Sequence, residues 1–247
     1  MKKILCYIAC MALCGLSYGQ FVSQGKITFE RKTNLRQQVQ TEDDNGEWVK
    51  SNISKIAQYT ISDFIMTFNS EASTYEFEKE REVTGMTLSW GPKPGRENKV
   101  YTNFKTGKIM AQKNVYENDY LVEEPVPVFK WKIVDEMRSI AGYPCRKAVT
   151  RICDSVVVVA YYCDQIMVSG GPEGFNGLPG MILGLAVPRL YTTWFATNIE
   201  LLPQEVKAFK PLKKSKVVDN TTLVAEVKKG TKDWGKYGDK LIWWLML

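Results

Sequence analysis

The sequence contains no histidine among its 247 residues. This absence excludes a Ser-His-Asp or Cys-His catalytic arrangement and any histidine-based zinc site, and it removes the commonest general base of near-neutral pH. Catalysis by this chain would therefore depend on carboxylates, lysine, tyrosine or a lone cysteine. Long apolar runs are scarce as well. The run from Ile4 to Leu16 is too short to span a bilayer, which takes about twenty residues.

The start of the chain has the features of a cleaved secretory signal. Two lysines precede the apolar run, and Ser17-Tyr18-Gly19 puts small residues at the two positions that signal peptidase reads. We expect cleavage after Gly19, so that residues 1–19 are a signal peptide and the protein is exported to the periplasm, the outer membrane or the cell exterior. Lipidation at Cys10 or Cys14 is the alternative, and the residues before both cysteines depart from the lipoprotein pattern.

Cysteine is sparse in the remaining chain, which keeps Cys145, Cys153 and Cys163. An exported protein meets oxidising conditions, where thiols can pair. The segments RKAVTRI and VVVVAYYC predict a hairpin that turns near Asp154, and a symmetric turn would place Cys145 opposite Cys163, within reach of a cross-strand disulfide. Two small buried thiols are the alternative, because a shift of one residue would put the two side chains on opposite faces.

Alternation of apolar and polar residues dominates the chain and predicts an all-β, antiparallel fold. It is clear in segments 59–62, 75–78 and 191–199. A helical pattern is hard to find before residue 215, and the segment 219–230 predicts one short helix with Asp219 or Asn220 as N-cap. We therefore expect a single β-rich domain over 20–212, followed by a basic tail over 213–247.

The stretch GPEGFNGLPGMILGL, residues 171–185, concentrates glycine and proline. It is not a phosphate-binding loop, because no lysine follows the glycines, no helix is expected after them and their spacing is three throughout. Asn176-Gly177 predicts one tight turn, and Leu178–Met181 predicts a type II turn before a strand in which Gly184 permits a bulge. The residues of this structural motif are Gly171, Pro172, Gly177, Leu178, Pro179, Gly180, Met181 and Ile182.

Adjacent carboxylates are the only residues that suggest hydrolysis. They occur at Asp43-Asp44, Glu123-Glu124 and Asp135-Glu136. Glycoside hydrolysis needs two acids facing one bond, whereas neighbours on a strand point to opposite faces. We therefore expect solvated surface acids, and we predict no catalytic residue, no cofactor and no metal site.

The end of the chain is basic, with ten lysines against five acidic residues from residue 205 onward. Trp243 and Trp244 stand in its final apolar run, LIWWLML, and could contact a membrane surface or a partner, or pack onto the sheet. Because an exported protein meets lipid and glycan more often than nucleic acid, we expect no nucleic-acid partner.

The order of several motifs resembles that of the GLPGLI family, exported proteins of the Bacteroidetes. The hexapeptide stands here as Gly177-Leu178-Pro179-Gly180-Met181-Ile182, and it follows Trp131, the acidic pair Asp135-Glu136 and the element IAGYPCRKA, residues 140–148. Tyr161-Tyr162-Cys163 replaces the Trp-Tyr-Thr common in the family, so the pairing of cysteines would be private to this chain.

This resemblance implies a fold and only a broad function. The family is similar to the bowl-like amino-terminal domain of flavobacterial peptide N-glycosidases, a β-rich module separate from the catalytic part, which implies a curved sheet, half-barrel or bowl. It brings no catalytic residues. We expect a non-catalytic binding or envelope accessory protein with a glycan, peptide, lipid or outer-membrane protein as partner. A carboxylate-dependent hydrolase of glycan or peptide and a partner of an outer-membrane transporter are the alternatives.

Overall fold

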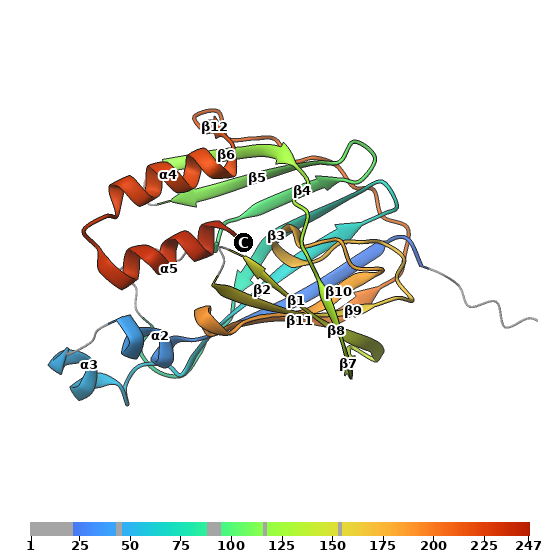
Figure 1. The fold of residues 1–247 in the computed structure, drawn as a ribbon. Coiled ribbons are helices and arrows are strands. Elements are labelled where there is room, and N and C mark those ends of the chain that lie inside the picture. Colours follow the sequence, from blue (N-terminus) through green and yellow to red (C-terminus); the bar gives the residue numbers. More distant parts are fainter. Residues whose placement is uncertain (1–21, 43–45, 88–94, 116–117, 153–154) are drawn as a thin grey trace, which may run out of the picture.

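The computed structural model describes residues 22–42, 46–87, 95–115, 118–152 and 155–247 (Figure 1). The expected signal peptide, the pair Asp43-Asp44, Cys153 and the turn residue Asp154 lie outside this part of the chain.

One open twelve-stranded sheet forms the molecule, and it curls around the segments that cover one of its faces (Figure 1). The spatial order is β12-β6-β5-β4-β3-β2-β1-β11-β10-β9-β8-β7, and all neighbours are antiparallel except the β12–β6 pair. The expected all-β class and curved sheet are confirmed. The strands are β1 Gly25–Asn34, β2 Tyr59–Phe68, β3 Ala72–Glu80, β4 Lys99–Asn103, β5 Lys108–Val115, β6 Asn118–Pro125, β7 Lys132–Ile140, β8 Tyr143–Ile152, β9 Val156–Cys163, β10 Met181–Val187, β11 Thr192–Glu200 and β12 Lys216–Val218.

The β8–β9 hairpin has the register predicted for a symmetric turn. Arg146 pairs with Tyr162 and Ile152 with Val156, so the two strands stay in step along their described length. In β10 the pairing with β9 shifts between Ile182 and Gly184, which is the bulge expected there.

The sheet has an inner face, which we define as the face that carries Arg31, Lys113 and Trp194. Arg31 pairs with Trp194 across β1 and β11, so both side chains leave the sheet on the same side. Phe29 lies two residues from Arg31 and shares this face, and it is fully buried. The inner face therefore holds the hydrophobic core. On β11 the core side carries Trp194, while Phe195 is only half-buried on the outer face.

Helices complete the fold at two places. The short helices α2 Leu35–Glu42 and α3 Glu47–Asn52 follow β1 and were not expected from the sequence. The expected helix exists as α4 Asn220–Gly230, with the Asp219 side chain accepting a hydrogen bond from the Thr222 N–H. A second carboxy-terminal helix, α5 Gly235–Leu245, crosses the inner face (Figure 1).

The segment 213–247 is therefore not a tail. β12 joins the edge of the sheet, and α4 and α5 supply buried side chains to the main core, among them Leu223, Trp244 and Leu247. The prediction failed because lysines on the exposed sides of these elements dominate the composition, while apolar residues at helical spacing cover the sheet.

An extended strap, residues 201–215, links β11 to β12 across the outer face. Phe209 and Lys207 lie over β3 and β4. Farther along, the Gln112 carboxamide of β5 accepts hydrogen bonds from the Leu212 N–H and the Ser215 hydroxyl. The carboxy-terminal part of the chain thus contacts the outer face first and the inner face afterwards.

Candidate functional site

The glycine-rich stretch forms a loop that lies against the inner face. Its first part, Pro172–Gly174, is one 3-10 turn in which Glu173 has φ 55° and ψ 17°. This left-handed conformation is uncommon for a residue with a side chain and persists only where the surroundings impose it. A Cβ on Gly174 would lie 2.7 Å from the Ile109 side chain of β5, so the loop fits closely against the sheet.

The second part of the loop reverses the chain as expected, but by a different turn. The Gly180 N–H donates to the Leu178 carbonyl over 2.8 Å, which makes a γ-turn around Pro179, and the Met181 N–H donates to Ile166 instead of closing a type II turn. Gly180 has φ 147°, and a Cβ there would lie 2.1 Å from the Cys163 carbonyl oxygen. Close passage beside the end of β9 therefore requires glycine.

Glu173 is the residue that this loop carries into the centre of the molecule. Its side chain is buried, and its two oxygens accept hydrogen bonds from the Tyr75 hydroxyl of β3 and the Asn98 amide, each over 3.4 Å. The Trp194 indole nitrogen also acts to lower the pKa of this carboxyl, without reaching normal hydrogen-bond geometry. The sequence analysis missed Glu173, although a single carboxylate enclosed by glycines was its visible signal.

Two buried cations lie near Glu173. The Arg31 guanidinium of β1 lies 4.6 Å from the centre of the Phe64 ring and 5.6 Å from that of Trp244, and it donates a 2.8 Å hydrogen bond to the Gly95 carbonyl. Lys113 comes from β5 and is 4% exposed. We call Arg31, Tyr75, Asn98, Lys113 and Glu173 the inner polar cluster.

Burial and charge act in opposite directions in this cluster. Burial raises the pKa of Glu173, and the charges of Arg31 and Lys113 partly offset the effect. Burial also lowers the pKa of Lys113 to about 8 against the charges of Glu173 and Glu124, and it raises the pKa of Tyr75. Two cations therefore share one fully buried carboxylate.

Helix α5 supplies the remaining partners of the cluster. Lys113 Nζ donates to the carbonyl oxygens of Leu245 and Leu247, the latter over 2.9 Å. Trp244 packs edge-on against Trp194 with 6.1 Å between ring centres. The end of α5 thus presents backbone oxygens and apolar side chains to the inner face.

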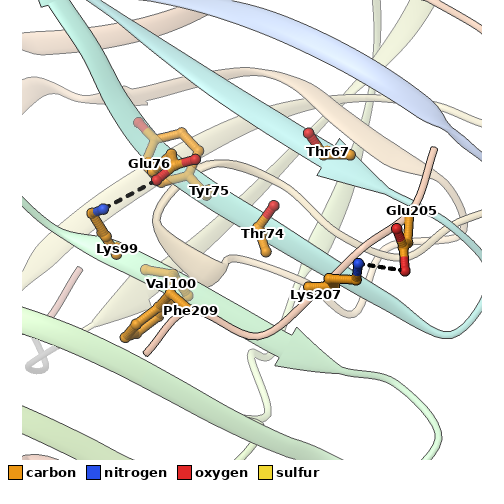
Figure 2. A pocket seen from close by; sticks show the side chains of 9 residues that line it. All are labelled: Thr67, Thr74, Tyr75, Glu76, Lys99, Val100, Glu205, Lys207 and Phe209. Carbon is orange, nitrogen blue, oxygen red and sulfur yellow. Dashed lines mark ion pairs between the residues drawn. The ribbon is translucent and has the colours of Figure 1, made fainter. Parts of the chain in front are cut away.

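A pocket of about 310 Å³ opens on the other side of the same strands (Figure 2). We call it the strap pocket, because the strap forms one wall. Two ion pairs belong to it, Lys99–Glu76 at 3.3 Å and Lys207–Glu205 at 2.8 Å, and Figure 2 shows Thr74 between them. Its lining residues are Thr67, Thr74, Tyr75, Glu76, Lys99, Val100, Glu205, Lys207 and Phe209.

The cysteines that the sequence pairs are neighbours in space. Cys145 and Cys163 are buried free thiols at the start of β8 and the end of β9. Their mutual hydrogen bond lowers the pKa of Cys163 and raises that of Cys145. The disulfide remains a prediction, and the register it requires is present.

The tryptophans of the final apolar run pack onto the protein. Trp244 is 7% exposed in the core, and Trp243 is half-buried under the Arg189 guanidinium, 4.7 Å from its ring centre. Of the two alternatives for these residues, packing onto the sheet holds. The exposed patch on which the transporter-partner hypothesis depended is therefore not formed by them.

The adjacent acidic pairs do not converge on a site. Glu123 is exposed, Glu124 accepts a hydrogen bond from the Asn220 N–H, and Glu136 lies on the outer face, where Lys147 and the Tyr161 hydroxyl donate to it. Within the described residues, no three cysteines or carboxylates gather in a way that could hold a metal ion. No helix in that part of the chain is long and apolar enough to cross a bilayer.

Comparison with known proteins adds a family. A family model described as "Protein of unknown function (Porph_ging)" matches residues 149–184, which include β9, Glu173 and the hexapeptide as far as Ile182. The chain belongs to the GLPGLI-type family. No curated protein matches it.

Solved structures share the fold of this GLPGLI-type chain. PNGF-II in a C2 crystal form has a TM-score of 0.50 at 16% identity over 90% of this chain and 33% of its own. PNGF-II in a P21 form gives 0.47 at 18% over 86% and 33%, and an uncharacterized conserved protein from Thermus thermophilus gives 0.39 at 10% over 85% and 98%. The GLPGLI-type chain thus spans about a third of the length of the PNGF-II chains. The first likeness confirms the predicted similarity of fold.

Proposed function

We propose that this chain is an exported, non-catalytic binding protein of the cell envelope and that the strap pocket holds a carbohydrate. The lining of the pocket carries the proposal. Hydroxyls of Thr67 and Thr74 and the charged groups of two ion pairs offer donors and acceptors, and the Phe209 ring offers an apolar surface. This mixture suits a ligand that has hydroxyl groups on its edges and apolar faces.

The size and position of the pocket support the same conclusion. Its volume lies at the lower end of the range of ligand pockets, which suits one or two sugar rings. The floor is rigid sheet, whereas the wall is a strap without regular structure, so a ligand can be held by a fixed surface and an adaptable one. The fold likeness to PNGF-II agrees with a carbohydrate ligand, because the resembling peptide N-glycosidases act on glycans.

A binding role explains the carboxylates of the pocket better than hydrolysis. Glu76 and Glu205 are each ion-paired with a lysine, and their side chains are 49% and 72% exposed. The general acid of a glycosidase is kept protonated by apolar surroundings, which neither carboxylate has.

Saturation-transfer NMR with a panel of soluble oligosaccharides, chitotriose first, tests the proposal. We expect contacts from the sugar ring protons, with an affinity that falls about tenfold in Phe209→Ala. Leu212→Ala is the matched control, since Leu212 is an exposed apolar residue of the same strap outside the pocket. A panel without any binder, or equal losses in the two variants, would refute the strap pocket as a carbohydrate site. Release of sugar during the titration would refute the non-catalytic assignment.

A further inference from the structure

The inner polar cluster is not used by the strap pocket, although its charges are costly to bury. Arg31 and Lys113 are 7% and 4% exposed, and Glu173 is the one carboxylate among the described residues that is as deeply buried beside them. Burying ions in this way weakens a fold unless geometry or function repays the cost. The cluster therefore calls for an explanation beyond stability.

The cover of this cluster is a helix with little stability of its own. α5 has eleven residues, including Gly235 and Gly238, and isolated helices shorter than about 12–15 residues are marginal in water. Its helical state depends on the inner face, where Leu241, Trp244 and Leu245 are buried. Dissociation from that face would also unfold it.

The link to α5 is free to move. A Cβ on Gly230, at the end of α4, or on Gly235, at the start of α5, would meet no atom within 4 Å, and Gly235 has φ 52°. These positions can change backbone direction without steric conflict. α5 can therefore leave while α4 stays on β6.

The chemistry that α5 presents is that of an amphiphile. Lys113 Nζ binds two backbone oxygens, of Leu245 and Leu247, and the side chains of these residues and of Trp244 fill an apolar basin that includes Trp194. A carboxylate would accept stronger hydrogen bonds from Lys113 than neutral carbonyls do, and it would balance the second buried cation. A long apolar chain would replace the buried side chains.

We infer that the inner face is a second ligand site, specific for an amphiphilic carboxylate of the fatty-acid type, which α5 occupies in the free protein and vacates on binding. Lys113 holds the carboxylate head, and the basin beside Trp194 and Phe29 takes the apolar chain. Glu173 and Asn98 position the cations from the side of the glycine-rich loop.

Hydrogen exchange read by mass spectrometry tests this inference on the full chain. Sodium dodecanoate is the probe, and dodecyltrimethylammonium has the same chain length with a cationic head. We expect dodecanoate to speed exchange of the amides of residues 235–247 about tenfold, while β1 and β11 stay protected. The cationic probe should leave α5 protected. An unchanged α5, or equal effects of both probes, would overturn the inference, as would binding of dodecanoate without loss of α5 protection.

Two variants separate the head group from the cover. Lys113→Met should raise the half-saturating concentration of dodecanoate about tenfold, whereas Lys108→Met, at an exposed lysine of the same strand, should not change it. Leu245→Ala should lower that concentration, because weaker seating of α5 reduces the cost of displacing it. Circular dichroism verifies that each variant is folded. Weaker binding in Leu245→Ala would show that α5 contributes to the site instead of competing for it.

Discussion

The hydroxyl of Tyr75 lies 3.4 Å from Oε1 of Glu173 and joins β3 to the glycine-rich loop. Because successive side chains of a strand alternate, Tyr75 reaches the inner polar cluster, while its neighbours Thr74 and Glu76 line the strap pocket. One short segment of β3 thus belongs to both proposed sites. Substitutions at Tyr75 would disturb the two together, so tests of either site are better placed elsewhere.

Replacing Glu173 with glutamine should destabilise the fold. Gln keeps the size of the side chain and the hydrogen-bonding capacity, but it leaves Arg31 and Lys113 without the carboxylate that offsets their burial. We expect the free energy of unfolding to fall by about 3 kcal/mol, the range for breaking a buried ion pair. Urea denaturation with an unchanged m-value would measure it.

Glu205→Gln is the matched control for that substitution. Glu205 is also paired with a lysine, but its side chain is 72% exposed, and exposed pairs contribute less than about 1 kcal/mol. Similar losses in the two variants would contradict a special role for the buried cluster.

Stability should rise with pH through the range in which Lys113 titrates. The pKa of Lys113 is lowered to about 8 in the folded chain, so between that pH and its ordinary pKa the unfolded state binds more protons. From about pH 7.5 to about pH 9.5 we expect a gain of roughly 2 kcal/mol that Lys113→Met lacks. Urea denaturation of both proteins across this range provides the measurement.

The difference between wild type and variant isolates Lys113 from its neighbours. The thiol of Cys163, whose pKa is lowered, also titrates here, and Tyr75, whose pKa is raised, opposes the gain near the top of the range. Both are present in the two proteins. Parallel pH profiles would show that Lys113 stays protonated in the folded state.

Gly180→Ala should be far more damaging than a change at another left-handed glycine. Its Cβ would meet the Cys163 carbonyl oxygen, whereas Gly107 has φ 64° and nothing within 4 Å of a Cβ. Gly107→Ala should cost about 1 kcal/mol from conformation alone, and Gly180→Ala more than about 3 kcal/mol because the loop must move away from β9. Thermal unfolding of both variants would compare them, and equal costs would rule out the close approach as the reason for glycine.

Cys145 and Cys163 should form a disulfide on oxidation. In a Cys153→Ser variant treated with glutathione disulfide, the Cys163 thiolate would attack the glutathione disulfide, and Cys145 would then displace glutathione from the mixed disulfide. Two molecules of reduced glutathione leave, and the protein loses two hydrogen atoms. Intact mass after alkylation would count the remaining thiols. Persistent alkylation of both cysteines in unfolding conditions would exclude the bridge, and Cys145→Ala should stop at the mixed disulfide.

Local patterns predicted the elements whose partners are near in sequence. The β8–β9 register followed from a symmetric hairpin, and α4 followed from its Asp219 cap and its terminal lysines. α5 was missed because two glycines interrupt its helical pattern, and only the inner face stabilises it. The strap has no periodic pattern, so neither its path nor the pocket beneath it could be inferred.

The role of Glu173 depended on contacts that no local pattern contains. Its partners Tyr75 and Asn98 lie 98 and 75 residues earlier, and the cations come from β1 and β5. The glycine spacing predicted where the chain turns, but not that the turn delivers a carboxylate to the core. Long-range pairing of strands decides that outcome.

The seating of α5 on Lys113 also sets the order in which the molecule can be completed. The strands emerge during synthesis before residues 235–247, so an apolar basin beside Trp194 stays uncovered until the last helix is made. A chain in this state would expose sticky surface to its neighbours, and a bound amphiphile could shield it in the interval. The same helix that closes the finished protein would then mark the moment when it no longer needs a chaperone.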